Sequence, residues 1–215
     1  YSVRGPIHAK MGVKNQDAFL AVKNPNCLLG VVADGVGSAK FPRFASRKIV
    51  KTIISFNKAY LRKKIDFNEF ESFVDSHFVP EYYPSFLKLG MEATCLFAIL
   101  YSDELILGRV GDGLLWYSIN DVDYSLAGPE AEFTNLVSPI SGKKNHAKWI
   151  LKKIKLNVGD RVEVMLACDG VSEDLLPGKI TGFAKGLLER CKKEDTNEPI
   201  KRLLENWPNK SSPDD

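Results

Sequence analysis

The chain has 215 residues, and its 30 Lys and Arg against 27 Asp and Glu give a formal net charge of only +3. This length supports a buried core without disulfide staples, which excludes a disulfide-dependent mini-protein. Hydrophobic residues make up 44% of the chain, a typical value for a water-soluble globular domain. The near-balanced charge is far below that of a dedicated nucleic-acid-binding protein, so we expect no nucleic-acid partner.

No apolar stretch approaches the roughly 20 residues that a membrane span needs, and the first residues do not resemble a signal peptide. The four cysteines form no CxxC pair and are expected to be reduced core residues. We therefore expect a cytoplasmic protein with no membrane partner. The three histidines, His8, His77 and His146, lie far apart in the sequence, which argues against a zinc site built from imidazoles. Any metal would depend on oxygen ligands.

Turn residues and apolar periodicity in the first 80 residues predict a hairpin followed by two helices. The predicted strands cover 17–22 and 27–33 and are joined by the turn-rich segment KNPN. From Phe41, apolar residues recur at steps of three and four, which predicts an amphipathic helix with a basic opposite face. A second helix is predicted from Asp66, because Glu69 completes a capping box.

Short apolar segments separated by turn residues follow in the middle of the chain. The segments ATCLFAILYS, LILGRV and LLWYSI predict a three-stranded meander. After a polar region, a turn at Gly159–Asp160 leads into an apolar strand that ends at Asp169, and two helices follow, the second opening at Pro199. This order of elements indicates one α+β domain.

Three of the apolar runs stop at an Asp-Gly pair, at Asp34, Asp112 and Asp169. A strand that ends on Asp presents a carboxylate at the rim of a sheet, and the following glycine lets the backbone turn sharply. Asp17, at the start of the first strand, offers a fourth carboxylate. Clustered carboxylates repel one another unless a hard cation neutralises them. The pattern therefore indicates a site for Mg²⁺ or Mn²⁺.

An Asp-Gly pair is also a common hairpin turn, and this alternative applies unequally to the three positions. Asp112 lies between two apolar segments where a turn is expected anyway, so spacing alone leaves open whether it is only a turn residue. Asp34 and Asp169 are followed by polar segments without a returning strand, and hairpin geometry explains them less well. The string GRVGDG partly imitates a phosphate-binding loop, but it lacks the GK[ST] ending of a P-loop.

Four segments, NQDAF, VVADGVGSA, GRVGDGLLW and LACDGVSEDL, resemble in their order and spacing the motifs of the metal-dependent type 2C protein Ser/Thr phosphatases. The likeness is greatest to the compact bacterial members. It implies an α+β fold, a four-layer αββα sandwich in which helices flank a central antiparallel β-sandwich, with two or three Mn²⁺ or Mg²⁺ ions at one edge. It covers nearly the whole chain, so we expect residues 1–215 to form a single domain that lacks its closing C-terminal strand.

The resemblance also implies the roles of individual residues. The catalytic carboxylates would be those of Asp34, which bridges the metals, Asp169 and Asp17. The metal ligands that it implies are Asp17, Asp34, the Gly35 carbonyl, Asp112 in an outer or third-metal position, Asp169, and either Asp214 or Asp215. Arg4 would hold the phosphate group, with Lys10 and Lys14 as weaker candidates.

The chain departs from the family pattern at two positions beside these motifs. Gln16 stands where many members have Glu, and Val36 stands where eukaryotic members often have His. A histidine general acid is therefore absent at position 36, which leaves metal-bound water or another residue as the proton donor. His8 is one candidate, although a lone histidine is more often structural.

These motifs imply a phosphatase that hydrolyses phosphoserine and phosphothreonine by attack of a hydroxide bridging two metals. Its partner would be a phosphorylated protein, opposite a Ser/Thr kinase, and we expect a monomer. Two alternatives remain: an inactive pseudophosphatase that keeps the fold as a binding module, and a metal-dependent hydrolase of small phosphoesters on an unrelated α+β fold.

Overall fold

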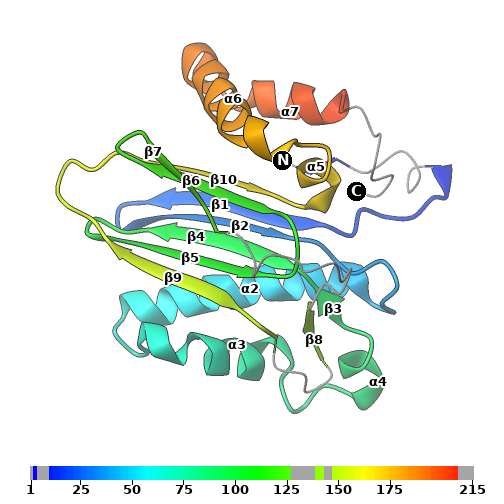
Figure 1. Cartoon of the computed structure of the whole chain (residues 1–215). Helices are drawn as coiled ribbons and strands as arrows, with labels where there is room; N and C mark the ends of the chain where they lie inside the picture. The colour runs from blue at the N-terminus through cyan, green and yellow to red at the C-terminus, as the bar shows by residue number, and fades with distance from the viewer. Residues whose placement is uncertain (1, 4–9, 127–138, 143–146, 208–215) are drawn as a thin grey trace.

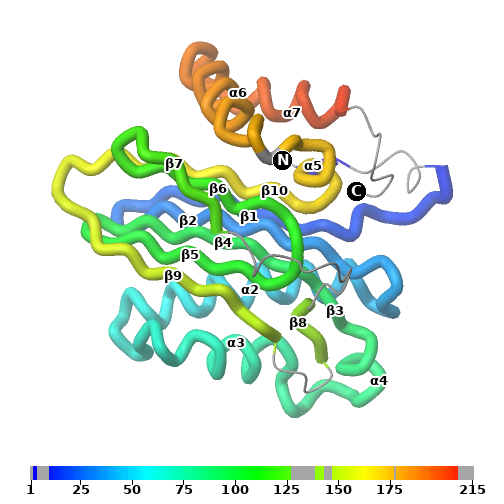
Figure 2. The backbone as a smooth tube through the Cα atoms, viewed as in Figure 1, coloured from blue at the N-terminus to red at the C-terminus, as the bar shows by residue number. Residues whose placement is uncertain are grey.

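A computed structural model describes residues 2–3, 10–126, 139–142 and 147–207 of the chain. Arg4, His8, Asp214 and Asp215 lie outside these residues, so their predicted roles are not addressed by the structure. The described elements form four layers, with two sheets in the middle and helices on both outer faces (Figure 1, Figure 2). The helices are α2 (Pro42–Leu61), α3 (Phe70–Phe78), α4 (Ser85–Lys88), α5 (Asp169–Ser172), α6 (Ile180–Glu194) and α7 (Glu198–Glu205).

The larger sheet is antiparallel throughout and has the order β1-β2-β4-β5-β9. The smaller sheet, of order β10-β6-β7, is also antiparallel. A short pair, β3 and β8, lies beside the end of the larger sheet (Figure 1). The strands are β1 (Ala18–Asn24), β2 (Cys27–Ala33), β3 (Glu92–Ala93), β4 (Cys95–Leu100), β5 (Glu104–Val110), β6 (Leu114–Ile119), β7 (Val122–Ser125), β8 (Ile140–Ser141), β9 (Ile150–Lys155) and β10 (Val162–Ala167).

Three hydrophobic cores separate the four layers. The largest lies between the helices α2 and α3 and the five-stranded sheet, and includes the fully buried Phe56, Phe70 and Phe97. A second core between the two sheets includes Leu107 and Leu115. The third and smallest lies between the three-stranded sheet and α6. This layering is the αββα sandwich expected from the sequence, because each amphipathic element buries one face against the next layer.

The predicted hairpin and helices are confirmed, with β1 and β2 joined at Asn24–Cys27 and α2 running to Leu61. The predicted second helix begins with a 3₁₀ turn, η1 (Phe67–Glu69), before α3. The backbone N–H of Asp66 donates a hydrogen bond to Glu69 Oε2 at 2.7 Å, as the capping-box pattern predicts.

The predicted three-stranded meander is wrong, because β5 and β6 belong to different sheets. β5 pairs with β4 and β9, whereas β6 pairs with β7 and β10. The chain crosses between the sheets at Gly111 and Gly113, whose φ angles of 85° and 96° lie in the left-handed region that favours glycine. The side chain of Arg109 fixes this corner by donating hydrogen bonds to the carbonyl oxygens of Gly111, at 3.0 Å, and Leu126, at 3.1 Å.

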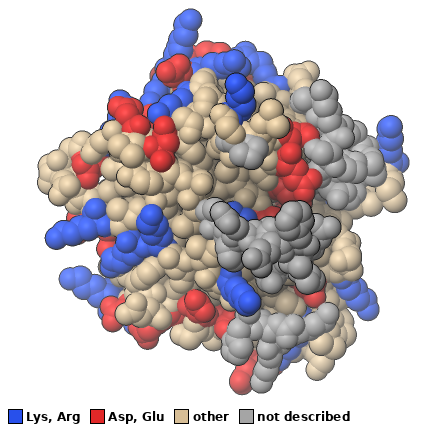
Figure 3. Space-filling view, in the orientation of Figure 1, with Lys and Arg blue, Asp and Glu red and all other residues tan. Residues whose placement is uncertain are grey.

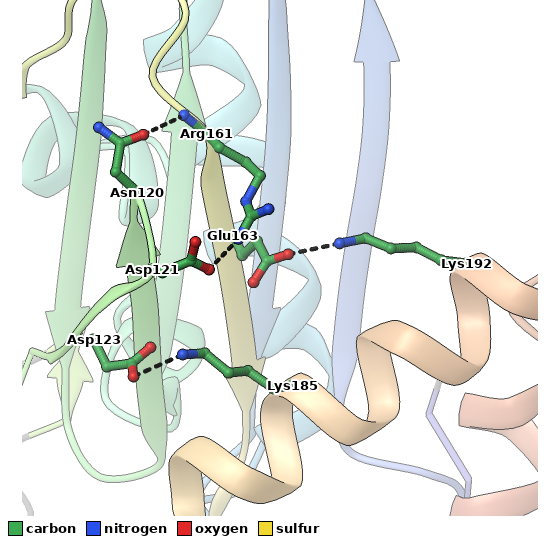
Figure 4. Close-up of polar contacts among 7 residues, drawn as sticks. All are labelled: Asn120, Asp121, Asp123, Arg161, Glu163, Lys185 and Lys192. Atoms are coloured by element: carbon green, nitrogen blue, oxygen red, sulfur yellow. Dashed lines mark hydrogen bonds and ion pairs between the residues drawn. The ribbon is translucent and has the colours of Figure 1, made fainter.

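Ion pairs join α6 to the three-stranded sheet across the edge of the smallest core (Figure 4). Lys185 Nζ lies 2.9 Å from Asp123 Oδ2, and Lys192 Nζ lies 2.6 Å from Glu163 Oε1. Such partly exposed pairs contribute little stability, typically about 0–1 kcal/mol each, so the outer helix is held mainly by its apolar face. Of the helices in the described part of the chain, none is long and apolar enough to span a membrane.

Candidate metal centre

Strand register brings the four aspartates of the sequence motifs to one edge of the sandwich. Ala18 pairs with Ala33, so Asp17, just before β1, and Asp34, just after β2, lie opposite each other. The same edge holds the end of β5 and the start of β6, with Asp112 between them, and Leu114 pairs with Ala167 near Asp169. Acidic side chains gather at the right-hand side of Figure 3, where α5 lies in Figure 1.

Asp34 is the electrostatic centre of this group. Burial, the charge of Asp17 and a hydrogen bond between the two side chains raise the pKa of Asp34 from 3.8 to about 9, and the charges of Asp169 and Asp112 act in the same direction. The carboxyl groups of Asp17, Asp169 and Asp112 are therefore close enough to disfavour the ionisation of Asp34. The structure thus places these aspartates near one another, and their role as metal ligands stays a prediction from the sequence.

Asp17 is held in place by polar residues that the sequence reasoning did not single out. Its backbone N–H donates a hydrogen bond to Asn15 Oδ1 at 2.7 Å. Asn15 Nδ2 donates to Ser2 Oγ at 2.7 Å, and Ser2 Oγ donates to Asp17 Oδ2 at 3.4 Å. An Asn two residues before the Asp is typical of such a turn, and it was the one signal in the sequence that could have revealed this contact.

Gly35 is buried and lies against the first residue of α2. A Cβ atom at Gly35 would be 2.4 Å from the carbonyl oxygen of Pro42, so any other residue would displace the helix. Gly35 forms an isolated antiparallel bridge with Ala93, closed by the bonds from Thr94 N–H to the Asp34 carbonyl and from Val36 N–H to the Glu92 carbonyl. In this type of bridge the carbonyl of the central residue points away from the partner strand, and is thus available to a ligand.

Asp169 opens α5, and its Oδ1 accepts a hydrogen bond of 2.8 Å from the backbone N–H of Gly170. The preceding residue, Cys168, also belongs to the cluster, because its Sγ lies 3.7 Å from Asp17 Oδ2. Burial raises the pKa of the Cys168 thiol, and the charges of Asp17, Asp169 and Asp34 raise it further. The sequence reasoning missed this role by treating every cysteine as a core residue.

Asp112 is a turn residue that also acts on the cluster. It lies between the two glycines of left-handed conformation, as expected for a turn. Its charge nevertheless contributes to the raised pKa of Asp34, and it opposes the effect of burial on the Arg109 guanidinium, whose pKa is lowered. Asp112 is therefore a turn residue whose charge also acts on Asp34 and Arg109.

The donor chemistry of the cluster fits a hard divalent cation. Its side chains offer carboxylate oxygens, and a bound cation would offset the burial and charge that disfavour the ionisation of Asp34. Among the described residues, no group of three or more His, Cys, Asp or Glu side chains is already arranged to hold a metal ion.

Lys10 and Lys14, the weaker candidates for phosphate binding, are exposed in the segment before β1.

Solved structures of phosphatases share this fold. The chain is similar to the serine/threonine phosphatase PstP/Ppp of Mycobacterium tuberculosis, with 17% identity, a TM-score of 0.64, and coverage of 95% of this chain and 88% of that one. It is also similar to the photosystem II phosphatase PBCP, with 17% identity, a TM-score of 0.63, and coverage of 95% and 75%. The likeness to RsbX in complex with magnesium has 16% identity, a TM-score of 0.61, and coverage of 100% and 88%.

These structures show the fold class that the sequence predicted, a sandwich of the phosphatase type. A family model described as Protein phosphatase 2C matches residues 4–205. The chain belongs to the protein phosphatase 2C family, which confirms the resemblance seen in its four motifs. A search of curated proteins found no match.

The raised pKa of Asp34 predicts how the stability of the metal-free protein depends on pH. The unfolded chain loses this proton near pH 3.8, whereas the folded protein keeps it to about pH 9, so the folded state binds more protons between these values. The contribution of Asp34 to the free energy of unfolding therefore falls as pH rises from about 4 to about 9. Urea unfolding in chelator at several pH values measures this effect as the difference between the wild type and Asp34→Asn.

As pH rises, the free energy of unfolding of Asp34→Asn should increase relative to that of the wild type, because asparagine has no proton to lose. A difference that stays constant from pH 5 to pH 9 would contradict the assignment of Asp34 as the proton-binding group.

Proposed function

We propose that this chain is a metal-dependent protein phosphatase that hydrolyses phosphoserine and phosphothreonine with Mg²⁺ or Mn²⁺ bound at one edge of the sandwich. We call this edge, where Asp17, Asp34, Asp112 and Asp169 lie, the carboxylate edge. The observation that carries the proposal is the group of carboxyl groups around the partly buried Asp34; burial, together with these neighbours, raises the pKa of Asp34 to about 9. Repulsion between these carboxylates lowers the stability of the folded state, so the cluster is best explained by a cation that binds there. The groups that would hold the metal are Asp17, Asp34, the Gly35 carbonyl, Asp112 and Asp169.

A bound divalent cation would lower the pKa of a coordinated water and neutralise the oxygens of the phosphoryl group. The residues of the chain would supply the carboxylates that hold the cation and the hydrogen bonds that orient them. Asp34 and Asp17 share a hydrogen bond between carboxyl groups, so a proton has to leave this pair before both can act as ligands. The hydrogen bond from the Asp17 backbone N–H to Asn15 and the one from Ser2 to the Asp17 carboxylate would keep Asp17 oriented while that proton leaves. With divalent cations bound, the site would present positive charge to an anionic substrate.

Several parts of this proposal stay predictions from the sequence. They are the last metal ligand, Asp214 or Asp215, the phosphate-binding role of Arg4, the number of ions, the single-domain organisation, the Ser/Thr kinase partner, the monomeric state and the cytoplasmic location. RsbX was solved in complex with magnesium and PstP/Ppp is a serine/threonine phosphatase, which supports the choice of metal and substrate.

A second candidate function is that of a pseudophosphatase, a binding module that keeps the fold without catalysis. The observation that favours it is the lack, among the described residues, of a ready-made group of metal ligands. Asp34 and Asp169 are both present, which favours the active enzyme. The two candidates differ in turnover and not in fold.

Hydrolysis of a phosphothreonine peptide and of an aryl phosphate, measured with and without Mn²⁺, tests the proposal. We expect turnover of both substrates with Mn²⁺, loss of turnover on addition of a chelator, and a loss of at least about 100-fold in Asp169→Ala, because a metal ligand is removed. Asp103→Ala is the control, since Asp103 is exposed in the turn between β4 and β5, at the opposite end of the sheet from the site.

Turnover that persists in chelator would contradict the metal mechanism. A folded protein that binds the phosphopeptide but turns over neither substrate with Mn²⁺ or Mg²⁺ would identify the pseudophosphatase instead.

A further inference from the structure

Large apolar side chains are exposed around α4 and the first turns of α2. The exposed fractions are 43% for Phe44, 80% for Tyr82, 62% for Phe86 and 58% for Leu89. Single exposed apolar residues are normal on a protein surface, but a contiguous group of this kind usually marks an interaction site.

Ring contacts between α2 and the segment that contains α4 form two groups, Phe41 with Phe86, and Phe44 with Tyr83 and Tyr82. The ring centroids of Phe41 and Phe86 are 6.2 Å apart, and those of Phe44 and Tyr83 are 6.1 Å apart. Tyr82 and Tyr83 stack edge to face at 5.1 Å. Figure 1 shows α4 on the same side of the molecule as the N-terminal end of α2.

Basic side chains border the same group. Lys48 Nζ lies 5.5 Å from the centre of the Tyr83 ring, and Lys40 Nζ lies 5.6 Å from that of Phe41. Arg47 is exposed one position before Lys48, on the helix face that Phe44 shares. We call the residues Lys40, Phe41, Phe44, Arg47, Lys48, Tyr82, Tyr83, Phe86 and Leu89 the α2–α4 surface.

The stability of α2 does not explain this basic character. The N-terminal end of a helix favours acidic side chains, yet the first turn of α2 has none and includes Arg43. The whole helix, PRFASRKIVKTIISFNKAYL, contains no Asp or Glu. Positive charge at this end therefore has a small cost in folding, which is consistent with a role in binding an acidic partner.

The α2–α4 surface begins where the candidate metal centre ends. Pro42, the first residue of α2, packs against Gly35, and the Phe41 N–H donates a hydrogen bond of 2.8 Å to the Gly90 carbonyl. A helix rises about 1.5 Å per residue, so Lys48 is roughly 9 Å along the helix from Pro42. An extended peptide spans about 3.3 Å per residue, so about three to six residues would reach from the site across this surface.

We propose that the α2–α4 surface docks the segment of the phosphoprotein substrate that flanks the phosphorylated residue, and that this segment carries an aromatic or aliphatic side chain together with acidic residues. The proposal rests on the proposed function and adds a substrate class to it. The exposed rings of Tyr82 and Phe86 would bury the apolar side chain of the substrate. Lys40, Arg47 and Lys48 would pair with its carboxylates, a complementarity that favours acidic over basic segments.

The test compares two substrates and two matched double variants. The peptide substrate carries phosphothreonine followed, four or five residues later, by Phe and two Glu, and the second substrate is an aryl phosphate too small to reach the surface. The test variant is Phe86→Ser with Arg47→Glu. The control variant, Leu61→Ser with Lys58→Glu, makes the same kinds of change at the opposite end of α2, where both residues are exposed.

We expect the test variant to lower kcat/KM for the peptide by about tenfold and to leave kcat/KM for the aryl phosphate within about twofold of the wild type. The control variant should leave both unchanged. Binding of the unphosphorylated peptide, followed by fluorescence anisotropy, should weaken about tenfold in the test variant only, which gives a measurement that does not depend on turnover.

Equal losses on both substrates, equal losses in the control variant, or a preference for a peptide with Lys in place of Glu would overturn the docking proposal. So would a wild-type dimer that the test variant converts to a monomer, because the surface would then be an interface between copies. If neither substrate is hydrolysed but the anisotropy difference appears, the proposed catalysis fails while the docking surface stands.

Discussion

We expect Asp34→Asn to lower kcat/KM for a phosphothreonine peptide by at least about 10³-fold, because the substitution removes the central carboxylate of the cluster. Asparagine has nearly the shape of aspartate but provides one neutral oxygen, so the charge that would hold a divalent cation is lost. The same substitution should make the metal-free protein more stable by about 1–3 kcal/mol near pH 8, since burial and the neighbouring carboxylates, which raise the pKa of Asp34, no longer disfavour a charge at this position.

These two effects have opposite signs, which separates a role in the site from a role in folding. Kinetics with Mn²⁺ measure the first, and urea unfolding in chelator measures the second. Asp103→Asn makes the same chemical change at an exposed position and should alter neither. A variant at position 34 that loses stability together with activity would contradict the assignment, because the aspartate would then be a structural residue.

Gly35→Ala should destabilise the protein by about 1–3 kcal/mol and lower activity by at least about 100-fold. The new Cβ would lie 2.4 Å from the Pro42 carbonyl oxygen and 2.5 Å from its carbonyl carbon, so backbone atoms have to move. A displacement of α2 would also shift the Gly35 carbonyl, and shifts of about 1 Å in a catalytic site cost about two orders of magnitude in rate.

Gly37→Ala is a matched control in the same loop. Its Cβ would have Gln16 Oε1 as a neighbour at 3.8 Å, an ordinary contact distance. Urea unfolding and turnover of the peptide should therefore stay near the wild-type values for Gly37→Ala. If the two variants behave alike, the close contact between Gly35 and Pro42 is not what the site requires.

Local patterns in the sequence predicted most elements of this fold. The hairpin of β1 and β2, the amphipathic α2 and the capping box at Asp66 each depend on neighbours within a few residues. The pairing of β6 could not be predicted in this way, because the burial of both β5 and β6 makes their sequences equally apolar. β9, with the sequence ILKKIK, was missed because an edge strand with lysines does not show a hydrophobic run.

The sequence predicted those residues of the site that lie at the ends of predicted strands. Asp17 and Asp34 had to meet once the hairpin register was known, and Asp169 follows the apolar strand β10 within two residues. Cys168 and Ser2 could not be assigned, because their contacts with Asp17 join segments that are far apart in the chain. The α2–α4 surface likewise appears only when α4 is placed beside α2.

The carboxylate edge draws its residues from both sheets of the sandwich. Asp17 and Asp34 belong to the five-stranded sheet with the largest core, whereas Asp169 follows β10 in the sheet backed by the smallest core. A cation held by all three would therefore act as a cross-link between the two halves of the molecule, much as a disulfide does. Loading the site would then stiffen the whole sandwich, and the affinity for the ion would include the energy of holding the two sheets together.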